Sequence, residues 1–275
     1  KEASDSTIID NSFSSIGKAV MCGRSLYKNI QRFLLFKLTV NVTACCIVLV
    51  GAFVGKDSPL TVTQMLWINL IMDTFGAMAL ASLPPSKDVM NEQPRKRGCD
   101  KMGNISNWAY FKEQWRLKSF IVNRPMLGEI LSVGIFFFLL LFTFLLVFQH
   151  SNVNSMLDLL HLDLTANDGV STYEQTLLFS IFVWTHFCYM FNARSFATGE
   201  SVFKLKMSKG FWTIVSLIVG GQLLITEAMY NFFNVEPMLH NTKQPNGALD
   251  LLIIVALSSL VVFAREIWRM AKGRK

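Results

Sequence analysis

Asn69 and Asp73 are the two residues of this sequence whose types and spacing best suit the binding of a cation. Asp73 is the only acidic residue in the sequence that lies well inside one of its long apolar segments. A carboxylate in the hydrocarbon of a membrane costs about 2.5–3.5 kcal/mol even on lenient insertion scales, so a chain that keeps one there usually holds or moves a cation with it. At about 100° per residue, side chains four positions apart project from nearly the same face of a helix. An amide oxygen and a carboxylate on one face suit a hard cation such as Ca²⁺.

Two side chains cannot complete the shell of about six to eight oxygen atoms that Ca²⁺ takes, so other helices must contribute ligands. Asn41 is the best further candidate, because it lies inside the preceding apolar segment, away from bulk water. The alternative for all three residues is structural, since buried polar side chains also join membrane helices through hydrogen bonds. His186 lies inside a later apolar segment, where a hydrogen bond between helices is a more common role for a lone histidine than ion binding.

The apolar segments indicate an all-α membrane protein with six transmembrane helices. Of the 275 residues, 52% are hydrophobic and 16% are charged. Runs of about 20 apolar residues, the length that crosses a bilayer, recur along the chain. Each run is expected to be a helix, because backbone polar groups cannot remain unpaired in lipid, whereas the strands of a membrane β-barrel would need only about ten residues each. The six segments are roughly 33–55, 60–82, 126–149, 174–193, 210–230 and 248–268.

The positive charges are distributed as expected for a membrane protein with both termini in the cytoplasm. Of the 26 Lys and Arg residues, only Lys56 and Lys243 lie in the connections 51–60, 150–173 and 231–247. The positive-inside rule therefore places the other connections and both ends of the chain on the cytoplasmic side. We attribute the net charge of +7 to this topology and to lipid headgroups, and no nucleic acid is expected as a partner.

A long helix is expected to carry the first transmembrane segment. It begins near Ser12 or Ser14, either of which can cap a helix, and can run unbroken to about residue 54. About forty residues at 1.5 Å each give roughly 60 Å, twice the thickness of the hydrocarbon layer. The surplus, residues 14–32, is expected to project into the cytoplasm as a stalk.

Signals of catalysis are absent from the sequence. It contains no Gly-rich phosphate loop, no Gly-x-Ser-x-Gly motif and no pair of carboxylates placed for acid–base chemistry. The five Cys residues show no metal-binding spacing, and reduced thiols packed as small apolar side chains are expected. The chemistry that the residues indicate is therefore ion binding.

Three segments share the sequence pattern of one protein family. Residues 8–16 read Ile-Ile-Asp-Asn-Ser-Phe-Ser-Ser-Ile, and residues 19–30 read Ala-Val-Met-Cys-Gly-Arg-Ser-Leu-Tyr-Lys-Asn-Ile. Residues 66–74 read Leu-Trp-Ile-Asn-Leu-Ile-Met-Asp-Thr and are followed by Pro84 and Pro85. In that order, the segments resemble the end of the phosphorylation domain, the stalk of the fifth transmembrane helix and the sixth transmembrane helix of the P-type Ca²⁺-transporting ATPases. The resemblance covers nearly the whole chain and implies that the six predicted helices are helices five to ten of such a pump.

The resemblance also implies roles for the candidate ligands. Asn69 and Asp73 match the side-chain ligands of the ion site nearer the fourth helix, which this chain does not include, and Asn41 matches an Asn of the fifth helix. Pumps of the endoplasmic-reticulum type carry Glu where this chain has Ala44 and His186, and the Glu at the first position helps to build a second site. The chain therefore resembles the plasma-membrane-type branch, which transports one Ca²⁺ per cycle.

Several parts of the family pattern are missing. The Asp-Lys-Thr-Gly-Thr motif, whose Asp is phosphorylated, and the Thr-Gly-Asp-Gly-Val-Asn-Asp motif, which helps to hold Mg²⁺, are absent from the sequence. So are the actuator and nucleotide-binding domains. The resemblance thus implies the C-terminal part of a pump, which starts just after the hinge and does not hydrolyse ATP alone. Ca²⁺ is then the transported ion, and ATP and Mg²⁺ bind upstream domains of the same pump. Those domains and the lipid bilayer are the expected partners, and the expected location is the cell membrane, the inner membrane of a bacterium.

The spans and the resemblance together predict how the chain is organised and how it works. Phosphorylation upstream would tilt the stalk, displace Asn41 relative to Asn69 and Asp73, and release the ion to the far side. Two alternatives remain: a pump for both Ca²⁺ and Mn²⁺, and a truncated, non-catalytic membrane bundle. The expected units are the end of the phosphorylation domain (1–13), the cytoplasmic stalk (14–32), the first two transmembrane helices with the ion site (33–82), a cytoplasmic loop (83–125) and a C-terminal four-helix bundle (126–275).

Overall fold

The computed structural model describes most of the chain, and nearly all of the described part is helical. It describes every residue except 1–6, 8–11, 54–58, 82, 86, 92–120, 152, 161–168, 197, 199–200, 206, 243–244 and 273–275. The side chains of residues 71–73, 87–88, 268–269 and 272 also lie outside the described part. Most of the segment expected to end the phosphorylation domain (1–13), and most of the expected loop (83–125), therefore lie outside the described residues.

Six helices within the described residues are long and apolar enough to cross a membrane. They are α1, Phe13–Phe53; a second span, Val62–Ala81, composed of α2 (Val62–Trp67), η1 (Ile68–Met72) and α3 (Asp73–Ala81); α5, Arg124–His150; α6, Thr172–Arg194; α7, Lys209–Glu227; and α9, Gly247–Lys272. The shorter elements are η2, Lys87–Asn91; η3, Met156–Leu160; η4, Val202–Lys204; and α8, Tyr230–Phe233. No strand occurs in the described residues, so the predicted all-α membrane fold with six transmembrane helices is confirmed.

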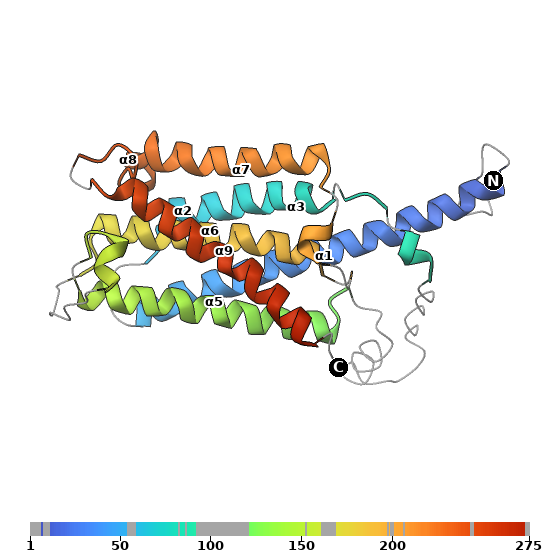
Figure 1. The fold of residues 1–275 in the computed structure, drawn as a ribbon, viewed down its shortest axis with the longest axis horizontal. Coiled ribbons are helices and arrows are strands. Elements are labelled where there is room, and N and C mark those ends of the chain that lie inside the picture. The colour runs from blue at the N-terminus through green and yellow to red at the C-terminus, as the bar shows by residue number, and fades with distance from the viewer. Residues whose placement is uncertain are drawn as a thin grey trace, which may run out of the picture.

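α1 is a single helix of 41 residues, about 62 Å long at 1.5 Å per residue. The N-terminal part of α1 extends beyond the other helices at one end of the bundle, which we call the stalk end (Figure 1). α5 begins and α9 ends at the stalk end. The long continuous helix expected from the sequence is therefore present, with bounds within one or two residues of those predicted.

α6 is the central helix of the bundle. Its most apolar window is 94% buried inside the protein, whereas the corresponding windows of the other spans are only 22–39% buried. Large side chains on several sides of α6, including Phe179, Phe182 and Tyr189, are fully enclosed. α6 also carries buried polar side chains, such as Thr176, Thr185 and His186, which would be costly in lipid, so its place at the centre of the bundle is the favourable one.

The helix starts follow from local capping residues. Thr61 and Ser171 each form a capping box. The hydroxyl of the cap residue accepts a hydrogen bond from the backbone N–H three residues later, and the side chain of that later residue accepts one from the backbone N–H of the cap residue. Asn123 and Ser208 cap α5 and α7 through their side-chain oxygens. These caps satisfy backbone N–H groups that lipid could not satisfy and set where the spans begin.

Candidate functional site: the second span and its contact with α1

The second span is not a regular α-helix where the candidate ligands lie. Residues Ile68–Met72 form a π-helix, Asn69 lies within it, and Asp73 is the first residue of α3. The expectation of a uniform 100° per residue is therefore wrong over this segment. The wider turn of a π-helix, closed by bonds between residues five apart, still places residues four or five apart on one face. Such single π-turns are frequently found at functional sites. The segment contains no Gly or Pro that would indicate an irregular helix, so the π-helix could not be predicted.

Close contacts fix the register between α1 and the second span. A Cβ atom added to Gly76 would lie 2.8 Å from the ring of Phe36, so the glycine is what allows α3 to approach α1 at this level. The amide of Asn29 donates to the carbonyl oxygens of Ala81 at 3.4 Å and Leu83 at 3.2 Å. The two helices therefore run antiparallel, and positions further along α1 face earlier positions of the second span.

This register brings Asn41 level with the π-helix. Asn41 follows Phe36 by five positions, and the position five before Gly76 is residue 71, between Asn69 and Asp73. At the end opposite the stalk, a Cβ on Gly51 would lie 2.7 Å from Pro59, which continues the same pairing. The three candidate ligands thus occupy one level of two packed helices. Asn41 is partly buried and Asn69 is exposed, and the side chain of Asp73 lies outside the described part.

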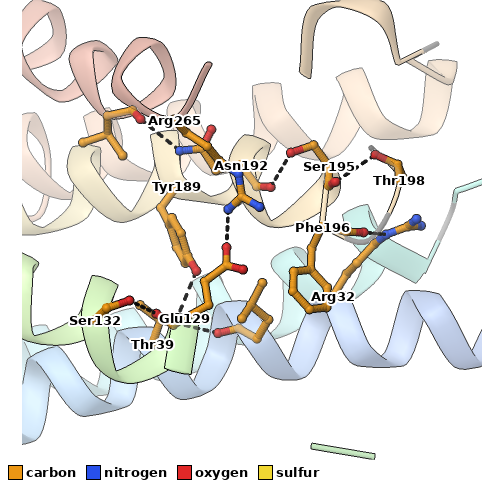
Figure 2. A network of polar contacts seen from close by, with 12 residues as sticks. Arg32, Thr39, Glu129, Ser132, Tyr189, Asn192, Ser195, Phe196, Thr198 and Arg265 are labelled. Atoms are coloured by element: carbon orange, nitrogen blue, oxygen red, sulfur yellow. Dashed lines mark hydrogen bonds and ion pairs between the residues drawn. The ribbon is translucent and has the colours of Figure 1, made fainter. Parts of the chain in front are cut away.

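Three polar side chains of α1 hold other segments at the stalk end, and we call Asn29, Gln31 and Arg32 the α1 collar. Gln31 donates to the carbonyl oxygen of Ile121 at 2.7 Å, just before α5. Arg32 donates through Nε to the carbonyl oxygen of Phe196 at 3.2 Å, just after α6 (Figure 2). It also donates through Nη1 to the side chain of Asn29 at 2.9 Å. With the bonds of Asn29 to the end of α3, the collar connects α1 to three other spans.

The collar shows that the last residues of the predicted stalk are packed against other segments. The stalk is predicted to comprise residues 14–32, and within it Asn29, Gln31 and Arg32 are only 5–8% exposed. In the sequence, these three residues are polar side chains at the border of an apolar segment. That pattern indicates contacts with other parts of the protein, but it does not identify the groups that are contacted. The partners are backbone carbonyl oxygens from residues up to 164 positions away, and side-chain types carry no information about those.

His186 has a structural environment in the bundle. Its side chain is 0% exposed and lies between the rings of Phe137 and Phe182, with centroids 5.2 Å and 4.2 Å away. Nδ1 donates to the carbonyl oxygen of Phe182 at 2.7 Å. The bond lies within α6, so the expected hydrogen bond between helices is wrong, because the residue one turn earlier offers its carbonyl oxygen at the right distance.

Acidic residues near the helix ends also have structural partners. Asp250 is fully buried and accepts bonds from the hydroxyl of Ser155 at 2.7 Å, the amide of Met156 at 2.8 Å and the hydroxyl of Tyr173 at 2.6 Å. Glu227 accepts from the amides of two residues in the loop after α8. Among the described residues, no group of three or more His, Cys, Asp or Glu side chains could hold a metal ion. Asn41, Asn69 and Asp73 therefore stay the predicted ion ligands.

Comparisons with known proteins identify the family. A family model described as "Cation transporting ATPase, C-terminus" matches residues 57–104 and 106–271. The chain is 33% identical over 244 residues to human plasma membrane calcium-transporting ATPase 3, covering 86% of the chain and 18% of that protein. It is 34% identical over 245 residues to calcium-transporting ATPase 8, plasma membrane-type, of Arabidopsis thaliana, covering 89% of the chain and 20% of that protein.

A shorter stretch is more similar still, with 52% identity over 97 residues to human plasma membrane calcium-transporting ATPase 4, or 35% of the chain and 8% of that protein. The chain thus spans about a fifth of the length of the relatives that it matches over most of its own length. The match over nearly all of the region from residue 57 to residue 271 shows that the chain belongs to the family of the C-terminal, membrane-spanning regions of cation-transporting ATPases.

Proposed function

We propose that this chain is the cation-transport part of an ATP-driven pump that exports Ca²⁺, with Asn69, Asp73 and Asn41 as side-chain ligands. The observation that carries the proposal is the register of α1 against the second span, in which Asn41 lies level with a π-helix that contains Asn69 and is followed directly by Asp73. The names of the relatives support Ca²⁺ as the ion. Amide and carboxylate oxygens are the ligands that Ca²⁺ prefers.

The remaining ligands come from the backbone and from outside the chain. Irregular helices inside membranes supply backbone carbonyl oxygens to cations, and the π-helix at Ile68–Met72 is such an irregularity. Ca²⁺ takes a shell of about six to eight oxygen atoms. The three side chains and the carbonyl oxygens of the π-helix supply part of that shell, and in this proposal a helix upstream of residue 1 supplies the rest.

The collar makes α1 a lever. From Asn29 to the start of α1 at Phe13 is 16 residues, about 24 Å, and from Arg32 to Asn41 is 9 residues, about 14 Å. If α1 pivots at the collar, a movement of about 3 Å at its start displaces Asn41 by about 2 Å in the opposite direction. Ca²⁺–oxygen bonds are about 2.3–2.6 Å long, so a shift of this size removes a ligand. In this proposal, phosphorylation of an upstream domain drives the movement.

The proposed orientation follows from the charges. The stalk end is cytoplasmic, as are both termini, because the connections on that side carry nearly all of the Lys and Arg residues. ATP and Mg²⁺ bind upstream domains of the same pump, and the full-length protein is the enzyme. The location is the cell membrane, and a bacterial source stays a prediction, since the relatives named above come from a human and a plant.

The proposal is tested by replacing Asp73 with Asn in the full-length pump and measuring ATPase activity against free Ca²⁺. Loss of a charged ligand is expected to raise the Ca²⁺ concentration for half-maximal activity by roughly tenfold or more. Asp158→Asn is the matched control, because Asp158 caps a loop at the opposite end of the bundle from the stalk through the amides of residues 154 and 155. An unchanged Ca²⁺ requirement in Asp73→Asn would reject the ligand assignment. Parallel titrations with Mn²⁺ show whether the ion selectivity is as proposed.

A further inference from the structure

A groove runs between α5 and α9 with α6 as its floor. It consists of two adjoining cavities, of about 560 Å³ and about 280 Å³, which share Phe136, Val261 and Ala264. We call it the α5/α9 groove. Its combined volume lies in the range of small-molecule sites, about 300–1,000 Å³.

The α5/α9 groove is polar at one end and apolar along the rest. At the stalk end, the larger cavity is lined by Glu129 on α5, Arg265 on α9 and Asn192 on α6. Figure 2 shows Arg265 reaching from α9 to Glu129, with Asn192 beside the pair. The smaller cavity is lined almost entirely by apolar side chains, such as Leu140 and Leu257. An occupant must therefore have a polar head and an apolar tail.

The polar end lies at the depth of lipid headgroups. α5 has 27 residues and is about 40 Å long, which spans the hydrocarbon layer of about 30 Å and part of both headgroup regions. Glu129 lies five residues, about 7.5 Å, inside the start of α5. The border between headgroups and hydrocarbon lies about 5 Å inside that helix end, so the backbone of Glu129 lies about 2.5 Å on the hydrocarbon side of it. Side chains of a helix tilt toward its N-terminus, so the carboxylate of Glu129 reaches back toward the glycerol level of a lipid.

The groups at the polar end can bind both signs of charge. Glu129 and Arg265 form an ion pair in which the two side chains remain 23% and 24% exposed, so each keeps hydrogen-bonding capacity toward the groove. Asn192 is 2% exposed, and its amide donates to the carbonyl oxygen of Val261 at 3.0 Å. Its side-chain oxygen has no partner among the described groups. A buried acceptor without a donor favours a ligand that brings N–H or O–H groups.

We propose that the α5/α9 groove is a binding site for a phospholipid with a primary ammonium headgroup, such as phosphatidylethanolamine. The phosphate accepts from Arg265, the ammonium donates to Glu129 and Asn192, and one acyl chain lies along the apolar part of the groove. A neutral ion pair matches a zwitterionic headgroup rather than a net anionic one. Choline has the same charge as ethanolamine but no N–H, so it cannot satisfy the two acceptors.

A lipid fits the α5/α9 groove better than a partner helix does. A helix about 10 Å in diameter occupies roughly 1,200 Å³ for each 15 Å of length, which exceeds the two cavities together. The site is independent of the transport role, because neither Asn69 nor Asp73 contributes to it.

The test measures which lipids stay bound to the full-length protein. The protein is equilibrated with detergent micelles that contain equal amounts of phosphatidylethanolamine, phosphatidylcholine and phosphatidylglycerol, and the retained lipids are counted by native mass spectrometry. We expect roughly tenfold enrichment of phosphatidylethanolamine over each of the others, the effect of one charge-assisted hydrogen bond. Retention in the proportions of the mixture, or preference for phosphatidylglycerol, would overturn the proposal.

Two variants separate the acyl chain from the headgroup. Ala264 lines both cavities, so the larger side chain of Ala264→Phe fills the junction between them and should abolish lipid retention. Ala256 is exposed on the same helix and lines neither cavity, so Ala256→Phe should retain lipid. Glu129→Gln keeps an acceptor for Arg265 but removes the charge that attracts ammonium. We expect it to retain lipid with no preference for phosphatidylethanolamine. Equal losses in both Ala→Phe variants, or a full preference in Glu129→Gln, contradict the assignment, as does a co-purified membrane helix in place of lipid.

Discussion

Gly76 sets the distance between the two helices that carry the proposed ion ligands, and Gly76→Ala tests that role directly. The added Cβ would lie 2.8 Å from a ring carbon of Phe36 and 3.3 Å from another. Phe36 is 0% exposed and is stacked against Tyr189, with ring centroids 6.4 Å apart, so its ring has little room to turn. The expected response is a displacement of α3 away from α1.

The magnitude follows from a comparison with a second glycine. Overpacking of this kind costs about 1–3 kcal/mol. Replacing Gly by Ala in a helix also gains about 1 kcal/mol from helix propensity, which must be subtracted. Gly220→Ala on α7 supplies that term, because a Cβ there meets no described atom within 4 Å. Gly76→Ala is therefore expected to unfold about 1–3 kcal/mol more easily than Gly220→Ala, a difference of roughly 2–12 °C in Tm for a unit of this size.

The assay is thermal unfolding of the full-length protein in detergent, followed by the Ca²⁺ dependence of its ATPase activity. Because Asn41 and Asp73 lie within five positions of the contact, displacement of α3 should also weaken Ca²⁺ binding. Phe36→Leu should restore part of both properties in the double variant, since contacting residues are not additive. If Gly76→Ala and Gly220→Ala unfold at the same temperature, or if Phe36→Leu rescues nothing, the inferred register between α1 and α3 is wrong.

Three further predictions concern polar contacts. Arg32→Met leaves the carbonyl oxygen of Phe196 without its donor, and an unfolding cost of about 1–3 kcal/mol with reduced ATPase coupling is expected by thermal unfolding and activity assays. Asp250→Asn weakens three buried bonds at the opposite end of the bundle and should lower the Tm by several degrees without changing the Ca²⁺ requirement. Tyr189→Phe removes a hydroxyl 3.4 Å from that of Thr39, and a cost of about 0.5–1.5 kcal/mol in denaturant unfolding would confirm this contact between α6 and α1.

The fold was predictable because a bilayer allows few solutions. Runs of about 20 apolar residues must be helices in lipid, and α6 and α9 lie where the apolar segments 174–193 and 248–268 predict them. Even the long first helix was predictable, because no proline lies between residue 14 and residue 54. The confirmed features are thus those that depend on composition and length alone.

The features that escaped prediction depend on geometry between segments. The π-helix at Ile68–Met72 replaces one hydrogen-bonding pattern by another of similar energy, and tertiary packing decides between them, so no residue type marks it. The α1 collar is formed by side chains that the sequence shows, but its acceptors are backbone carbonyl oxygens at Ala81, Ile121 and Phe196. Every residue has such an oxygen, so the sequence cannot indicate which ones are used.

The same distinction explains why the proposed ion site needs α1 to be both rigid and anchored. Asn41 was singled out as an amide in an apolar segment, which identifies a residue that must find a partner but not where that partner lies. The location follows from Gly76, whose missing side chain lets Phe36 approach and so aligns Asn41 with the 69–73 segment. A larger residue at 76 would leave each candidate ligand unchanged and still separate them. In the proposed mechanism, ion binding at this level is therefore a property of the contact between two helices. The collar holds α1 about two and a half turns from Asn41, so we expect a movement of the N-terminal part of α1 to reach the proposed site through it.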